Sequence, residues 1–136
     1  MLSAEMEKWA REYASAFQSY LQLAAGGALP IARLYIALWG AGLNPRITSG
    51  FRDPAKQRAL QARWDAGDRA GLRVRPATNS LHSRMSTMGS PASIAVDMPC
   101  DDDGRGAAIA QSMGVGAGMS FSTPDPGHYY LLGGYA

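Results

Sequence analysis

The two histidines most constrain the fold of this chain, because the sequence contains no others and places them in distant segments. His82 follows a Ser-Leu pair, and His128 precedes two tyrosines. Between them, the apolar run 94–96 reads as a short buried strand that ends at Asp97, a charge that needs a partner. Two neutral imidazoles and a carboxylate from separate segments suit a catalytic metal ion whose fourth position is left to water. The sequence therefore predicts a fold that brings these three side chains together.

Composition favours one compact domain. The chain has 136 residues, of which 46% are hydrophobic and 18% are charged, and these values are typical of a soluble globular protein. The net charge is only +2, and the arginines are scattered rather than clustered, which does not favour a nucleic-acid partner. A mildly cationic surface is equally suited to an anionic polymer such as a bacterial cell wall.

The cysteine count and the N-terminal residues bear on where the protein acts. Cys100 is the only cysteine, so no internal disulfide is expected. The first residues lack the basic and apolar regions of a signal peptide, and no apolar run is long enough to span a membrane. We therefore expect a product made in the cytoplasm, which needs another export route for any work outside.

Periodicity and turn residues predict an α+β domain. Expected helices lie at about 3–25, 29–42, 53–66 and 105–113, and expected strands at about 46–51, 93–98, 119–121 and 128–132. Ser3 and Asp53 are predicted N-caps, the latter followed by proline at the first helical position. The apolar face of the first helix is interpreted as packing on the core, with partner docking as the alternative.

Three weaker signals each have a structural interpretation that we prefer. The glycine-rich stretch 114–118 lacks the features of a phosphate-binding loop and favours close backbone packing. The acidic run 101–103 lacks the glutamate of a calcium loop and favours helix capping. Cys100 is interpreted as a buried apolar side chain rather than a metal-binding thiolate.

Asp125 is the candidate general base. It stands three residues before His128, close enough in an extended segment to take a proton from water without binding the metal itself. The three glutamates all lie in the first expected helix, so a base near His128 has to be an aspartate. The alternative is that Asp125 serves only a Pro-Asp-Pro-Gly turn.

These segments, taken in order, resemble the zinc D,D-carboxypeptidase and endolysin peptidase family of bacterial cell-wall enzymes. This family includes the VanX- and VanY-like peptidases and has the hedgehog/DD-peptidase-like fold, a small antiparallel sheet with a zinc cleft flanked by helices. The resemblance covers about 29–132. It is carried by Thr48-Ser49-Gly50-Phe51-Arg52, by Gln57, Leu60, Trp64 and Gly67, by Ser80-Leu81-His82, by Ala95-Val96-Asp97, and by Asp125-Pro126-Gly127-His128-Tyr129.

The resemblance implies roles for particular residues. Arg52 would bind the substrate carbonyl or carboxylate, with a surface ion pair to Asp53 or a neighbour as the alternative. Ser80 would contact substrate or orient a ligand, Asp125 would be the catalytic base, and Gln57 would be structural. The implied zinc ligands are His82, Asp97 and His128.

One departure from the family lies between the first histidine and Asp97. The two residues are 15 apart here, which is longer than the family spacing, and Ser93 stands where the family has glycine. A loop inserted at 83–92 explains the added length. We expect this loop to rim the cleft as a lid or specificity element; the alternative is that it occludes the site or displaces His82.

The resulting prediction is a zinc metallopeptidase that cleaves peptidoglycan stem peptides. Residues 1–136 would form a single catalytic domain, with an N-terminal amphipathic helix at 1–27 and a zinc peptidase core at 28–136. D,D-carboxypeptidase, D,D-endopeptidase and L-alanyl-D-glutamate endopeptidase activities all remain open. The protein would act in the periplasm or cell wall, as a phage-type lysin after lysis or as an injected antibacterial effector with an immunity protein as partner. Alternatives are a non-catalytic zinc-containing binding module and a nucleic-acid binder.

Overall fold

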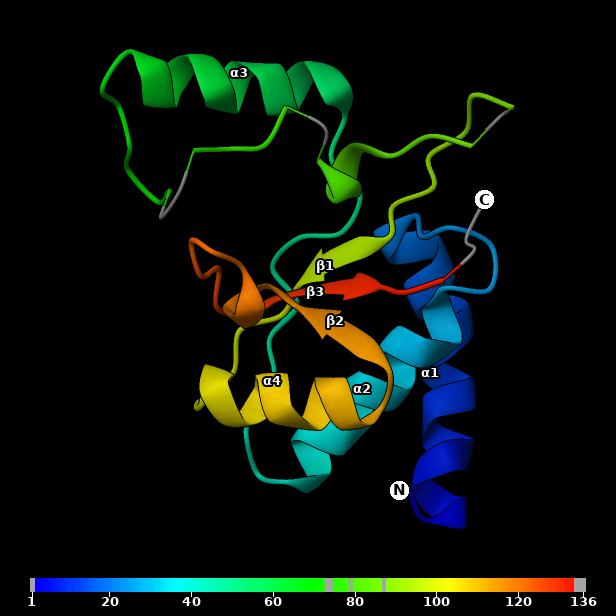
Figure 1. Ribbon diagram of the computed structural model, residues 1–136. Coiled ribbons are helices and arrows are strands. Elements are labelled where there is room, and N and C mark those ends of the chain that lie inside the picture. The colour runs from blue at the N-terminus through cyan, green and yellow to red at the C-terminus, as the bar shows by residue number, and fades with distance from the viewer. Residues whose placement is uncertain (1, 73–74, 79, 87, 134–136) are drawn as a thin grey trace.

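The computed structural model describes residues 2–72, 75–78, 80–86 and 88–133. In this part of the chain, four α-helices accompany a small three-stranded antiparallel sheet, so the expected α+β class is confirmed (Figure 1). The helices are α1 (Ala4–Leu21), α2 (Ala28–Gly40), α3 (Pro54–Asp65) and α4 (Asp103–Ser112). Short 3-10 helices, η1 (Leu81–Ser83) and η2 (Gly118–Ser120), lie beside the sheet.

Side-chain caps fix the starts of three helices. The Ser3 hydroxyl accepts a hydrogen bond from the backbone N–H of Met6 at 3.1 Å, and Asp53 accepts one from Ala55 at 2.8 Å. Asp102 caps α4 in the same way. Each cap satisfies a backbone donor that has no partner within the helix. The predictions of helix starts at Ser3 and Asp53 are confirmed.

Helix α1 packs along α2, and its side chains Ala10, Phe17 and Leu21 are buried in the core. The helix ends at Leu21, before the predicted end near residue 25. The reason is tertiary: the following backbone pairs with Ser93, whose carbonyl accepts a hydrogen bond from the N–H of Ala24 at 2.8 Å. Within the described residues, no helix combines the length and apolar character needed to cross a membrane.

The strands β1 (Ala95–Asp97), β2 (Val115–Ala117) and β3 (His128–Leu131) pair in the order β1-β3-β2. Because side chains alternate between the two faces of a sheet, each strand contributes to both. One face is apolar, and its residues Val96, Val115, Ala117, Tyr129 and Leu131 belong to the core. The opposite face carries Asp97, Gly116, His128 and Tyr130, so the alternation separates the polar site from the core.

Two predicted strands are wrong. Segment 46–51 is extended, but its hydrogen bonds go to separate partners: Thr48 donates to Asp97, while Phe51 donates to the carbonyl of Leu21 at the end of α1. Only a single bridge, Ser49 with Asp97, connects it to β1. Segment 119–121 overlaps η2, and the strand occupies the preceding glycine-rich residues instead.

Candidate metal centre

The sheet register and η1 together determine where the three candidate ligands lie. Asp97 at the end of β1 is paired with His128 at the start of β3, so both side chains project from one face of the sheet. His82 reaches them from η1, which is attached to the start of β1 by a hydrogen bond from Ile94 N–H to the carbonyl of Leu81 at 3.1 Å. Three distant segments thus meet at one point.

The three side chains converge as the sequence predicts. His82 Nε2 lies 3.2 Å from Asp97 Oδ1 and 3.3 Å from His128 Nδ1. His128 Nδ1 lies 3.1 Å from the same Asp97 oxygen. One donor atom from each residue therefore forms a nearly equilateral triangle, and the set can hold a metal ion. Both histidines are buried, whereas about 30% of the Asp97 side chain is exposed.

Hydrogen bonds on the far side of His82 fix the ring. Its Nδ1 lies 2.8 Å from the carbonyl oxygen of Gly50, so Nδ1 carries a proton and Nε2 is the ring nitrogen that faces the centre. Gly50 itself lies tightly against α1: a β-carbon there would come within 2.8 Å of Leu21 Cα. The Ser80 hydroxyl accepts a hydrogen bond from the backbone N–H of His82 at 3.2 Å. Ser80 also lines the cleft, so both of its predicted roles stay open.

Asp97 is held in its charged form. Burial raises the pKa of its carboxyl group, but hydrogen bonding and electrostatic attraction from the neighbouring His128 and His82 rings outweigh that effect. The pKa of Asp97 is therefore well below its ordinary value. Its second oxygen lies 3.8 Å from the Arg52 guanidinium. An ionised carboxylate is the form that binds a cation.

Arg52 lies inside the cleft and makes its contacts there rather than with Asp53. Its backbone N–H donates to the carbonyl of His82, and its Nη1 donates to Gln57 Oε1 at 2.7 Å. Gln57 is only 3% exposed, and its Nε2 donates in turn to the carbonyl of Ala77 at 2.9 Å. Gln57, expected only to be structural, therefore orients the arginine beside the metal centre. The position of Gln57, one turn into the helix that follows Arg52, is the sequence feature from which this contact could have been predicted.

Asp125 lies beside the triangle without belonging to it. Its Oδ2 is 3.9 Å from His128 Nδ1, and about a third of its side chain is exposed. The turn that carries it is closely packed, because a β-carbon on Gly118 would come within 2.6 Å of the Asp125 carbonyl oxygen.

Phe121, which the sequence did not indicate as a site residue, stacks on Tyr130, and its ring centre lies 5.7 Å from that of His128. The cleft therefore has one apolar wall next to the metal centre.

The cleft containing these groups has a volume of about 950 Å³ and lies between α3 with its following segment and the 121–127 turn. The sequence led us to expect that the inserted segment 83–92 would form the rim of this cleft. That expectation is wrong. The described residues of the segment double back through a bridge between Met85 and Pro91, and none of them lines the cleft. Figure 1 shows this segment projecting away from the sheet at the upper right. The added length therefore neither covers nor displaces His82.

The weaker sequence signals have structural explanations in the fold. Gly116 lies in β2 directly beneath the ring of Tyr130, where a side chain would collide with it. Within the acidic run, Asp101 accepts from Asn44 and Asp103 accepts from the backbone of Cys100, so the residues serve different contacts rather than one ion. The Cys100 side chain is buried, and its thiol lies outside the metal centre.

Comparison of the chain with models of known protein families and with curated proteins finds no match in either.

Proposed function

We propose that the protein is a zinc peptidase acting on peptidoglycan stem peptides. The observation that carries the proposal is the spacing of the three donor atoms, which lie 3.1 to 3.3 Å from one another. Donors about 2.0–2.1 Å from a zinc ion in a tetrahedral site lie about 3.3 Å apart. Two imidazoles and one carboxylate also match the ligand types of catalytic zinc sites with one open position.

The side chains around this triangle support hydrolysis. When bound, the zinc ion would supply Lewis acidity to water and to a carbonyl group. Asp125 would accept a proton from water in the cleft and pass it to the leaving amine. Arg52, held rigid by Gln57, would stabilise negative charge that develops on the substrate oxygen. Both groups reach into the cleft that contains His82.

The substrate class rests on the resemblance of the motifs to cell-wall peptidases. Arg52, His82, Asp97 and His128 occur in the order that this family uses, and Asp125 stands before the final histidine. We therefore propose the hedgehog/DD-peptidase-like fold for this domain. A lysin released at lysis and an injected antibacterial effector both fit such an activity, and an immunity protein would be the partner of the effector.

Digestion of purified sacculi followed by mass spectrometry of the muropeptides tests the proposal. The zinc-loaded protein should release stem-peptide fragments, and the masses identify the bond that is cut. A chelator should abolish cleavage, and Asp125→Asn should slow it by about 10²–10⁴-fold while zinc stays bound. Zinc binding without any cleavage would instead identify the non-catalytic binding module.

A further inference from the structure

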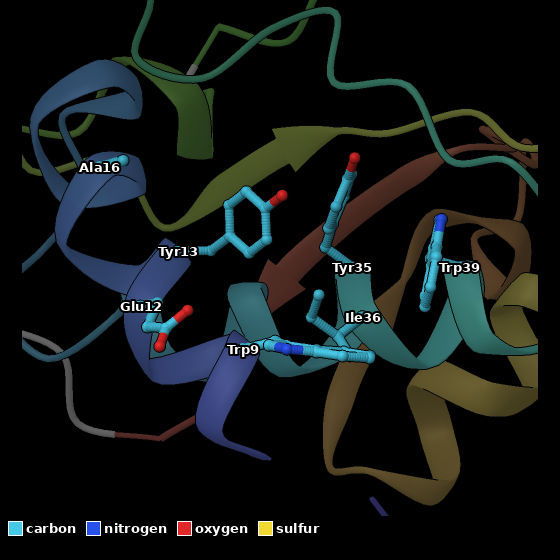
Figure 2. A pocket seen from close by; sticks show the side chains of 7 residues that line it. All are labelled: Trp9, Glu12, Tyr13, Ala16, Tyr35, Ile36 and Trp39. Atoms are coloured by element: carbon cyan, nitrogen blue, oxygen red, sulfur yellow. The ribbon is translucent and has the colours of Figure 1, made fainter. Parts of the chain in front are cut away.

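A second cavity, of about 530 Å³, lies between α1 and α2. It shares no lining residue with the cleft that contains His82, Asp97 and His128, which we call the metal cleft. This volume is within the range of small-molecule binding sites. Figure 2 shows the side chains that line it. They are Trp9, Glu12, Tyr13, Ala16, Tyr35, Ile36 and Trp39.

Aromatic rings form the walls and floor of this cavity. Tyr35 and Trp39 project from α2 one turn apart, while Ile36 and the Trp9 ring lie at the base (Figure 2). The Trp9 and Trp39 rings are nearly perpendicular at 84°, with centroids 5.7 Å apart, so they form a corner. Trp39 is 53% exposed and Tyr13 is 47% exposed. Aromatic surface that would ordinarily be covered therefore faces an open cavity.

The charge of the cavity is negative. Glu12 is its only charged lining residue, and among the described residues its carboxylate forms no ion pair. The neighbouring acid, Glu7, differs: it accepts hydrogen bonds from Arg33 and lies 3.3 Å from Arg11. The guanidinium groups of Arg11 and Arg33 are thus directed to Glu7, and a bound cation would meet a Glu12 carboxylate that forms no ion pair among the described residues.

Three chemical classes of occupant can be compared with this lining. An apolar helix would bury the Glu12 carboxylate without a partner, which is strongly unfavourable. A sugar could stack on the rings, but each of its hydroxyl groups would also need a partner, and the polar atoms of the lining are one carboxylate, two tyrosine hydroxyls and two indole N–H groups. A quaternary ammonium ion needs no hydrogen bonds, is attracted to the faces of aromatic rings, and is complementary to the single carboxylate.

We propose that the α1–α2 cavity binds a quaternary ammonium group of the choline type. The cation lies in the corner formed by Trp9 and Trp39 and is neutralised by Glu12. The tyrosine rings complete the enclosure. This site does not depend on the peptidase activity or on a bound metal.

Nuclear magnetic resonance titration of the full chain with choline tests the proposal. The indole N–H signals of Trp9 and Trp39 should shift saturably, whereas the signal of Trp64, which lines the metal cleft, should not move. The uncharged analogue 3,3-dimethylbutanol has the same shape and should bind at least about fivefold more weakly. Phosphocholine, titrated in parallel, shows whether the natural ligand is a phosphocholine headgroup or a free quaternary ammonium compound. Binding as tight as that of choline identifies a headgroup, and weaker binding identifies a free ammonium compound.

Variants separate the contributions of charge and rings. Trp39→Ala should raise the Kd for choline by about fivefold or more. Glu12→Gln should raise it by about threefold, because an exposed carboxylate contributes modestly. Tyr20→Ala, a change at a ring that is 76% exposed and lies outside the cavity, should leave the Kd unchanged. Equal binding of choline and its neutral analogue, binding of N,N′-diacetylchitobiose in place of choline, or no shift at either tryptophan would each overturn the proposal.

Discussion

Replacing Gln57 with methionine tests how Arg52 is held in the cleft. Methionine has a similar shape but offers none of the hydrogen bonds of the amide group, and Gln57 is only 3% exposed. The change removes the bond from Arg52 Nη1 at 2.7 Å, of a charged type that contributes about 1.5–3 kcal/mol. It also removes the neutral bond to the carbonyl of Ala77 at 2.9 Å, which contributes about 0.5–1.5 kcal/mol. We expect the free energy of unfolding to fall by about 2–4 kcal/mol.

Urea denaturation of the metal-free protein measures this loss, and Gln61→Met is the matched control. Gln61 lies one turn further along α3 and donates to the carbonyl of Pro76 at 3.1 Å and, more weakly, to the exposed Thr78 hydroxyl at 3.3 Å, but it forms no hydrogen bond with Arg52. Its replacement should lower the free energy of unfolding by about 1 kcal/mol or less. In the cleavage assay, Gln57→Met should lower kcat/KM by about tenfold, because a loosened guanidinium is misplaced. Equal stability of the two variants would refute the role given to Gln57.

Two further predictions concern the packing around the metal centre. Gly50→Ala should destabilise the fold by about 1–3 kcal/mol and weaken zinc binding by about 10–100-fold, because the new methyl group meets Leu21 and shifts the carbonyl that orients His82. Gly104→Ala, where the nearest atom lies at an ordinary 3.5 Å, should leave zinc affinity unchanged when both variants are titrated with zinc in a calorimeter. Cys100, whose thiol pKa is raised by burial, should react with a thiol reagent at pH 8 only after denaturant is added; rapid reaction of the native protein would contradict its burial.

Local signals in the sequence were sufficient for the helix starts and for the candidate ligands. A side-chain cap such as Ser3 or Asp53 acts within three residues of itself, so its effect can be read without knowledge of the fold. The candidate ligand set could be predicted because His82 and His128 are the only histidines. The apolar run before Asp97 located the remaining carboxylate.

Features that depend on distant backbone partners could not be predicted in the same way. The segment 46–51 has the composition of a strand, yet its N–H groups find partners at Asp97 in β1, at Pro99 just beyond β1 and at Leu21 at the end of α1. The end of α1 is set by pairing with Ser93, far along the chain. Likewise, the apolar face of α1 predicted core packing, but the sequence does not show that Tyr13 faces a cavity.

The central claim is that His82, Asp97 and His128 hold one zinc ion. Titration of the metal-free chain with zinc, followed by calorimetry, measures this claim most directly. The claim predicts one ion per chain and loss of that ion when any of the three residues is replaced by alanine. It also predicts that Asp125→Ala retains the ion. A chain that binds no zinc, or that keeps it after His128→Ala, would contradict the claim.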